Sequence, residues 1–272
     1  MTGFIANARM YAVTPAVEAV WRTLIAEVAE AAHVPLVYEA YHAPKPLEAL
    51  WARPDLGCVF MCGYPIASRL ADVVPIAAPI PDAPWAAGEP QYRTDFIVRA
   101  DSRFTTLTET FVGRFGWTVP HSHSGFNAPR HHLLRYRAPG SAKKIFGDVA
   151  RDLVTARRVL DAVIDGTIDA GPLDAYWHLL VGAHLPGLAA RVRVVETSDV
   201  APMPALVASP HMPAEAVVRL RQGFAQVHRA SWFAPVGAAL RLQGFAPMGH
   251  DDYAMTLRWE REAVEAGYLA PE

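Results

Sequence analysis

The chain has 272 residues, of which 52% are hydrophobic and 19% charged, so it can bury a sizeable core and is not expected to be disordered. Its length suits one bilobed unit or two small domains. The formal net charge of -2 argues against nucleic acid or an anionic membrane surface as a partner. No apolar run approaches the length of a spanning helix, so no membrane insertion is expected.

The N-terminal residues and the cysteines bear on where the protein works. A signal peptide needs a basic start and then an apolar stretch, but Asn7 and Arg9 interrupt the first apolar residues here. We therefore expect a cytoplasmic protein as the sequence stands, or a periplasmic one if a signal peptide has been removed. Cys58 and Cys62 are too few for a disulfide scaffold, and we expect two buried free thiols.

Strand and helix signals alternate along the first third of the chain. Thr14-Pro15 has the pattern of an N-cap followed by proline in the first helical position, and apolar residues then recur at helical spacing up to Val28. The pattern predicts strands at 4–8, 34–38, 56–61 and 73–79, and a short helix at 46–51.

The alternation continues after a Pro-, Ala- and Gly-rich connection at 79–90. Asp174 is placed to cap a helix that begins at Ala175. The pattern predicts strands at 95–99, 115–119, 167–170, 192–196 and 206–209, and helices at 107–111, 131–136, 148–165, 175–181, 213–229 and 251–266.

This alternation predicts an α/β fold whose parallel sheets are covered by helices on both faces. The connections near residue 85 and at 196–204 are interpreted as two crossings between lobes. Lobe 1 would then comprise 1–92 and 197–272, and lobe 2, at 93–196, would be an insertion.

The turn Ser122-His123-Ser124-Gly125 is the strongest candidate for a functional site. It follows a predicted strand and precedes a helix, and ligands of open α/β sheets bind at the carboxyl ends of strands. The start of a helix offers unpaired N–H groups to anions, and Gly125 would let a ligand approach the backbone. The structural alternative is that Ser124 only caps the helix, or that Asn127 caps it with Pro129 in its first turn.

The histidines are densest around this turn, at His121, His123, His131 and His132. Two histidines separated by one residue can bind zinc. No cysteine or carboxylate lies at a matching local spacing, so no metal site is expected, and no cofactor motif occurs in the chain.

Four short motifs occur in a fixed order along the chain. They are Met10-Tyr11, Cys62-Gly63-Tyr64-Pro65, Tyr92-Arg93-Thr94 followed by 96–101, and Ser122-His123-Ser124-Gly125-Phe126-Asn127-Ala128. In this order they resemble the phosphate/phosphonate-binding family of ABC-transporter substrate-binding proteins. The resemblance runs from about Met10 to Ser209, and the Ser-x-Ser-Gly turn is its most specific part.

The resemblance implies a two-lobed type II periplasmic-binding-protein-like fold, in which each lobe is a mainly parallel sheet flanked by helices. It also implies a ligand oxyanion held by hydroxyls and amides of the turn, and a ligand group that meets an acidic residue. The implied ligand-binding residues are Ser122, His123 through its backbone, Ser124 and Gly125, then Tyr92 and Thr94 facing the same oxyanion, Tyr11 and Tyr64 on the other lobe, and Asp174.

The implied function is non-catalytic binding of a small anion for an ABC-transporter permease or a sensor protein. Many family members carry a histidine in a stretch that corresponds here to Val154–Arg157, which has none. An organic carboxylate is therefore as consistent with the sequence as phosphate or phosphonate. The alternative is a cytosolic enzyme on the same fold acting on a small carboxylate-bearing metabolite, with His123 or Asp174 as the acid or base.

Overall fold

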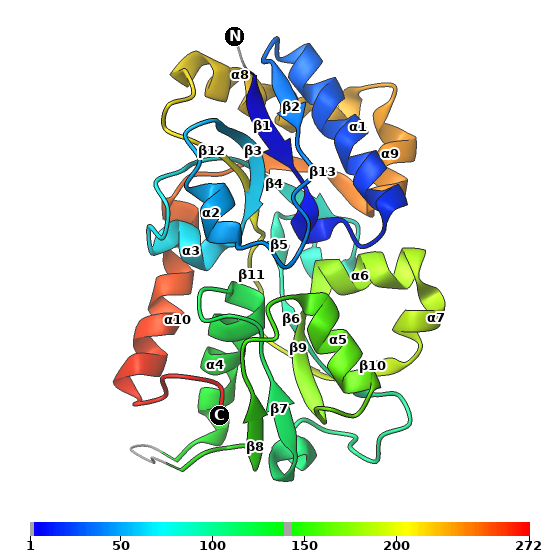
Figure 1. Ribbon diagram of the computed structural model, residues 1–272, viewed down its shortest axis with the longest axis vertical. Helices are drawn as coiled ribbons and strands as arrows, with labels where there is room; N and C mark the ends of the chain where they lie inside the picture. The colour runs from blue at the N-terminus through cyan, green and yellow to red at the C-terminus, as the bar shows by residue number, and fades with distance from the viewer. Residues whose placement is uncertain (1–2, 139–142) are drawn as a thin grey trace. The chain divides into compact units, whose positions relative to one another are not determined.

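The chain divides into two units, each built around its own sheet, in a computed structural model that describes residues 3–138 and 143–272 (Figure 1). Unit 1 comprises Met1–Gln91 and Pro202–Ala254, and unit 2 comprises Tyr92–Ala201 and Met255–Glu272. The predicted α/β class is confirmed, because helices and strands alternate through both units. The expectation of mainly parallel sheets is wrong: both sheets are mixed, because β12 and β13 in unit 1 and β6 in unit 2 run antiparallel to their neighbours.

The sheet of unit 1 has the strand order β13-β4-β12-β3-β1-β2. Parallel pairing joins β1 to β2 and to β3, whereas β12 and β13 run against their neighbours. The strands are β1 Phe4–Asn7, β2 Leu36–Tyr38, β3 Leu56–Met61, β4 Val74–Pro81, β12 Ala205–Ala208 and β13 Leu242–Pro247.

Helices and a buried aromatic group complete unit 1. The longest helix, α1, begins as predicted, because the Thr14 hydroxyl accepts a hydrogen bond from the N–H of Val17 at 3.1 Å. In the core, Phe60 meets Tyr11 at 5.0 Å and Trp21 at 5.1 Å, edge to face. The helices are α1 Pro15–Ala31, α2 Leu47–Trp51, α3 Gly63–Ala67, α8 Ala214–Gln226 and α9 Phe233–Leu240.

The sheet of unit 2 has the order β10-β6-β9-β7-β8. β7 pairs in parallel with β8 and with β9, and β6 runs antiparallel between β9 and β10. The strands are β6 Thr94–Arg99, β7 Arg114–Gly116, β8 Asp148–Ala150, β9 Ala170–Asp174 and β10 Val192–Thr197.

An aromatic cluster forms the core on one side of this sheet. Phe115 stacks on Phe146 with ring centroids 4.3 Å apart, and Tyr268 from the end of the chain belongs to the same cluster. The helices of unit 2 are α4 Ala128–Leu133, α5 Ala156–Ile164, α6 Ala175–His184, α7 Pro186–Ala189 and α10 Ala254–Glu265, the last beginning on the final residue of unit 1.

The chain passes between the units three times, and the third passage differs from the expected division. The first two passages form β5 Gln91–Tyr92 and β11 Ala201–Pro202, which pair with each other. We expected every residue after 196 in lobe 1, but residues 197–201 and 255–272 belong to unit 2. The physical reason is that Trp259 and Tyr268 are buried against unit 2 side chains.

One predicted helix is wrong in its first half. Residues 148–165 were expected to be one helix, but β8 occupies 148–150 and α5 begins only after Thr155, whose hydroxyl accepts from the N–H of Arg158. Asp152 and Val154 adopt positive φ angles of 56° and 67°, which a right-handed helix excludes. Helix α9 and strand β13 were not predicted.

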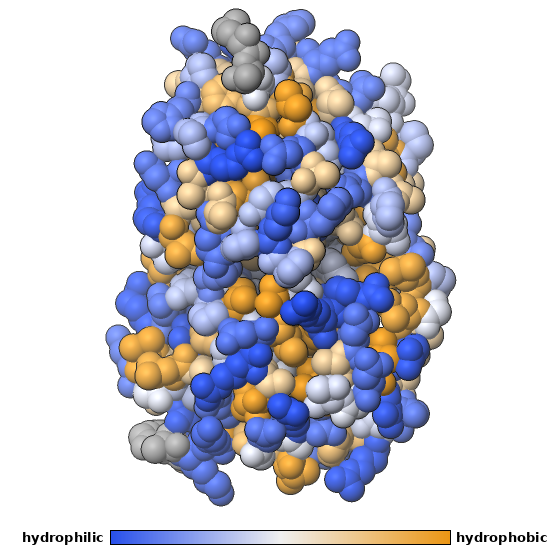
Figure 2. Space-filling model, viewed as in Figure 1, coloured by the Kyte–Doolittle hydropathy of each residue, from blue (hydrophilic) through white to orange (hydrophobic). Residues whose placement is uncertain are grey.

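Three further observations concern the surface and the thiols. Neither Cys58 nor Cys62 forms a disulfide; Cys58 is buried as expected, whereas Cys62 is only half-buried. Within the described ranges, no helix is long and apolar enough to cross a membrane. Apolar and polar residues are interspersed on the face seen in Figure 2, as is usual for a water-exposed surface.

Candidate functional site

One edge of the unit 2 sheet gathers most of the predicted site residues. The parallel strands β7 and β9 end at this edge, and the antiparallel strand β6 begins there, so that Thr94 is the register partner of Asp174. The turn at 122–125 follows β7 and reaches the same edge, because the Thr94 hydroxyl donates to the Ser124 carbonyl at 3.0 Å. The sheet topology thus brings three separate chain segments together.

The turn itself is capped by Ser122. The Ser122 hydroxyl accepts a hydrogen bond from the N–H of Gly125 at 3.0 Å, and the Ser122 carbonyl accepts one from the N–H of Asn127 at 3.0 Å. Neither Ser124 nor Asn127 caps the helix, since Asn127 is already helical and makes no side-chain cap. The Ser122 O–H remains able to donate while its oxygen accepts.

Pro129 explains why the helix starts as a π-helix over His123–Asn127. Proline has no N–H to donate, which leaves carbonyl groups one turn back without an intrahelical partner. The carbonyls of Ser124 and Gly125 accept instead from the Thr94 hydroxyl and from the Thr118 N–H at 3.3 Å. The widened turn is therefore held from outside the helix.

Gly125 is required by packing rather than by backbone freedom. A Cβ at this position would lie 2.1 Å from the Thr118 Oγ1 and 2.9 Å from the Ser122 Oγ. The glycine thus lets the turn lie directly on Thr118. We interpreted Gly125 as a point of close ligand approach, which stays a prediction.

Asp174 starts helix α6, as predicted. Its Oδ1 accepts from the N–H groups of Tyr176 and Trp177, both at 2.9 Å, and the residue is buried. The carboxylate therefore compensates the positive end of this helix. Burial and the nearby Asp174 charge raise the pKa of the Tyr176 hydroxyl well above its usual range.

A carboxylate–imidazole pair that the sequence analysis did not single out lies next to these residues. The Asp95 Oδ2 and His178 Nδ1 are 2.8 Å apart, and the Arg93 Nε lies 3.4 Å from the Asp95 Oδ1. Successive strand residues point to opposite faces of a sheet, so Asp95 lies on the other face of β6 from Thr94. Because Asp95 and His178 are far apart in the sequence, no local sequence pattern indicated that they would pair.

The imidazole of His123 is buried beneath the turn. Desolvation, together with the nearby His131, lowers its pKa to about 3, so the ring is neutral at physiological pH. Its Nδ1 lies 3.4 Å from the Asn127 Nδ2, and its Nε2 has no hydrogen-bond partner among the described residues. The ring centroid lies 6.0 Å from that of Tyr92, which is also buried.

Two predicted residues belong to unit 1. Tyr11 is buried in the aromatic core described above. Tyr64 is half-buried on α3, where its neighbour Gly63 lies against the Tyr253 ring. Their assignment as ligand-binding residues stays a prediction.

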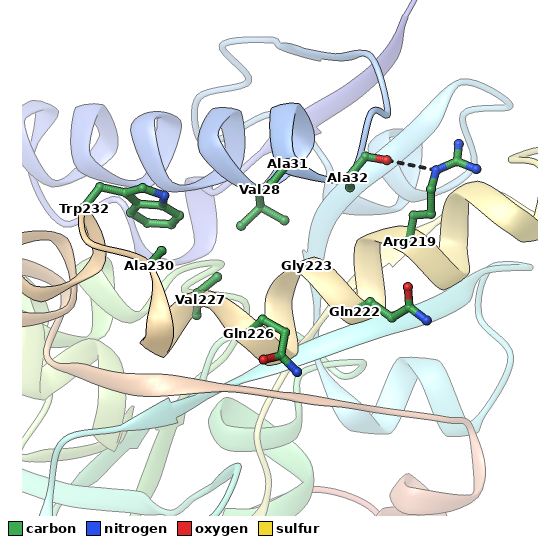
Figure 3. A pocket seen from close by; sticks show the side chains of 10 residues that line it. All are labelled: Val28, Ala31, Ala32, Arg219, Gln222, Gly223, Gln226, Val227, Ala230 and Trp232. Carbon is green, nitrogen blue, oxygen red and sulfur yellow. Dashed lines mark hydrogen bonds between the residues drawn. The ribbon is translucent and has the colours of Figure 1, made fainter.

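The structure also bears on the other candidate sites. In the described part of the chain, no three His, Cys, Asp or Glu residues are grouped so as to hold a metal ion. A cavity of about 390 Å³ lies in unit 1 between α1 and α8, where Arg219 donates to the Ala32 carbonyl at 2.9 Å (Figure 3). None of the predicted ligand-binding residues lines this cavity.

Comparison with known proteins gives one family and many similar folds. The family model described as "ABC transporter, phosphonate, periplasmic substrate-binding protein" matches residues 13–253. No curated protein sequence matches the chain.

Many solved structures are similar to this one, and three of them serve as examples. They are a binding protein component of an ABC phosphonate transporter from Pseudomonas aeruginosa (16% identity, 97% of this chain, 88% of that chain, TM-score 0.79), PhnD1 from Prochlorococcus marinus with methylphosphonate (15%, 95%, 97%, 0.76) and XAC2383 from Xanthomonas citri with ATP (15%, 98%, 98%, 0.67). At these identities the likeness is one of fold, and it confirms the expected two-lobed binding-protein fold.

Proposed function

Because the chain belongs to the family of periplasmic substrate-binding proteins of phosphonate ABC transporters, we propose that the turn at 122–125 binds the phosphonate group of its ligand. The observation that supports this site is the single sheet edge at which the turn, Thr94 and Asp174 meet. Open α/β sheets bind ligands at the carboxyl ends of their strands.

The donors at this edge suit a tetrahedral oxyanion. The first N–H groups of the helix that begins at His123 have no acceptor within the helix. The Gly125 N–H donates to the Ser122 hydroxyl, so the N–H groups of His123 and Ser124 are the ones offered to a ligand, together with the hydroxyl groups of Ser122 and Ser124. The Thr94 hydroxyl has a single O–H proton, and it donates this proton to the Ser124 carbonyl. We therefore assign Thr94 to holding the turn, and the amides and serine hydroxyls to contacting the ligand.

Asp174 adds a hydrogen-bond acceptor with negative charge to a site that otherwise offers donors. One of its oxygens is engaged by two backbone N–H groups, so the carboxylate is fixed at the sheet edge. A carboxylate in such a position accepts from a protonated oxygen or an amine of the ligand. We propose that this contact, with Tyr92, Tyr11 and Tyr64 as further ligand-binding residues, orients the ligand.

The family description and the methylphosphonate-bound structure favour an alkylphosphonate over inorganic phosphate or a carboxylate. We propose that the chain delivers this ligand to an ABC-transporter permease from the periplasm, the compartment in which the family works. Fractionation of cells that express the full gene tests the location.

The site is tested by calorimetric titration with methylphosphonate, inorganic phosphate, the dicarboxylate adipate and ATP. The double variant Ser122→Ala with Ser124→Ala is expected to lose methylphosphonate binding. The matched control is Ser102→Ala, since the Ser102 hydroxyl also accepts from a backbone N–H, that of Phe104, but lies beyond the opposite end of β6. Unchanged affinity in the double variant would refute the site, and a preference for adipate would refute the ligand class.

A further inference from the structure

The helical stretch that begins at the turn packs along the C-terminal helix α10 (Figure 1). Residues spaced by four on one helix and by three on the other share a face and can meet repeatedly. We call this set of contacts the seam; it consists of His123, Asn127 and His131 on one side and Thr256, Trp259 and Glu262 on the other.

Trp259 lies between two imidazoles of the seam. Its ring is 5.4 Å from that of His123 with an angle of 22°, and 4.7 Å from that of His131 with an angle of 1°. His131 also contacts the Glu262 carboxylate through its Nε2 at 2.7 Å. Because Trp259 and His123 are both buried, the indole fixes the position of a residue that is itself part of the turn.

Asn127 supplies the polar part of the seam. Its amide nitrogen donates to the Thr256 carbonyl at 2.9 Å, and its amide oxygen accepts from the Arg130 Nη2 at 2.9 Å. Asn127 and Thr256 are fully buried, so these bonds are protected from water. The last residue of the π-helical turn is therefore bonded directly to α10.

This support matters because a π-helix is rare, and in this one the Ser124 and Gly125 carbonyls accept from groups outside the helix. The turn is held by Ser122 and Thr94 on the sheet side and by the seam on the side of α10. We propose that Trp259 and Asn127 are positioning residues that hold the turn in its anion-binding geometry, so that α10 sets the affinity for the ligand. This inference rests on the proposed function of the turn.

The test compares two buried aromatic residues of the same C-terminal segment. Trp259→Leu removes the ring from the seam, whereas Tyr268→Leu removes a ring that packs in the unit 2 core and on the Arg137 guanidinium at 4.4 Å. Both variants are expected to lower the melting temperature. At a temperature well below both transitions, Trp259→Leu is expected to raise the Kd for methylphosphonate at least tenfold and Tyr268→Leu less than twofold.

Two additional measurements distinguish a positioning role of Trp259 from a general effect on the stability of the protein. Trp259→Phe retains a stacked ring and is expected to recover most of the affinity. Amide hydrogen exchange at 122–128 is expected to accelerate in Trp259→Leu but not in Tyr268→Leu, and this readout needs no ligand. Equal effects of the two leucine variants on exchange or on Kd would overturn the proposal, and so would the absence of rescue by phenylalanine.

The proposal can fail independently of the proposed function. One outcome would support the binding site but reject the role of the seam. In it, the Ser122 and Ser124 double variant loses methylphosphonate binding, whereas Trp259→Leu binds with wild-type affinity. If the wild-type protein bound none of the four ligands, the proposed function would fail, and the exchange data alone would decide whether the seam positions the turn.

Discussion

Replacing Ser122 tests charge at the turn without removing its cap. Serine, asparagine and aspartate are nearly equivalent as N-caps, so Ser122→Asn and Ser122→Asp should both keep the hydrogen bond from Gly125, which is 3.0 Å long in the native protein. The two variants differ in charge. Any anion bound at the turn would therefore meet a negative carboxylate in only one of them.

The size of the effect follows from Coulomb's law. Two unit charges at about 5 Å in an effective dielectric constant of about 20 repel by roughly 3 kcal/mol, which corresponds to more than a hundredfold in Kd. Ser122→Asp is thus expected to lose methylphosphonate binding relative to Ser122→Asn. Melting temperatures should differ little, since an acidic side chain is favourable at the start of a helix.

Isothermal titration of both variants with methylphosphonate measures the difference. Circular dichroism melts on the same samples show whether the cap is retained. A ratio of dissociation constants below threefold, with both variants folded, would refute the idea that an anion sits at this turn.

Gly125→Ala should destabilise the protein by about 1–3 kcal/mol, because the new Cβ would lie 2.1 Å from the Thr118 Oγ1. Adding Thr118→Ala removes this clash, so urea melts should show that the double variant recovers part of the lost stability. If the destabilisations of the two single variants simply added, the contact would be contradicted. Gly63→Ala should lower the melting temperature because its Cβ would lie 2.4 Å from the Tyr253 ring, and wild-type stability would disprove this packing. His123 has its pKa lowered from 6.5 to about 3, so the unfolded chain takes up the proton first and stability falls as pH drops from about 6.5 towards 3. The expected loss of stability is about 2 kcal/mol at pH 5, and it should be absent from His123→Gln. Urea melts of both proteins at pH 7 and pH 5 measure it. Equal losses in both proteins would contradict the lowered pKa of His123.

Local signals predicted those parts of the fold that depend on neighbours in sequence. Thr14 and Asp174 cap helices as expected, because capping needs only a side-chain oxygen two or three residues before the N–H it accepts from. The strand at 56–61 is a continuous buried run and was predicted with its observed limits. The turn at 122–125 was singled out by its place between a predicted strand and a helix, and Asp174 by its capping position, whereas Thr94 was named only through the family resemblance.

The errors arose where distant contacts decide the local structure. The cap of the turn was assigned to Ser124 or Asn127, but Ser122 caps it, because Pro129 shifts the hydrogen bonds and Thr94 occupies the Ser124 carbonyl. The apolar stripe of 148–165 does not reveal the two positive φ angles that separate β8 from α5. Periodicity likewise predicts that a C-terminal helix exists but not which unit it packs against.

The division of unit 2 along the chain has a consequence for synthesis. When a ribosome has translated residues 92–201, the turn, β9 and Asp174 have all been made, but α10 has not. Trp259 and the Thr256 carbonyl then have yet to meet His123 and Asn127. Unit 2 therefore completes its packing only after residues 255–272 emerge, and a fragment ending at residue 254 carries the turn without the helix that contacts it.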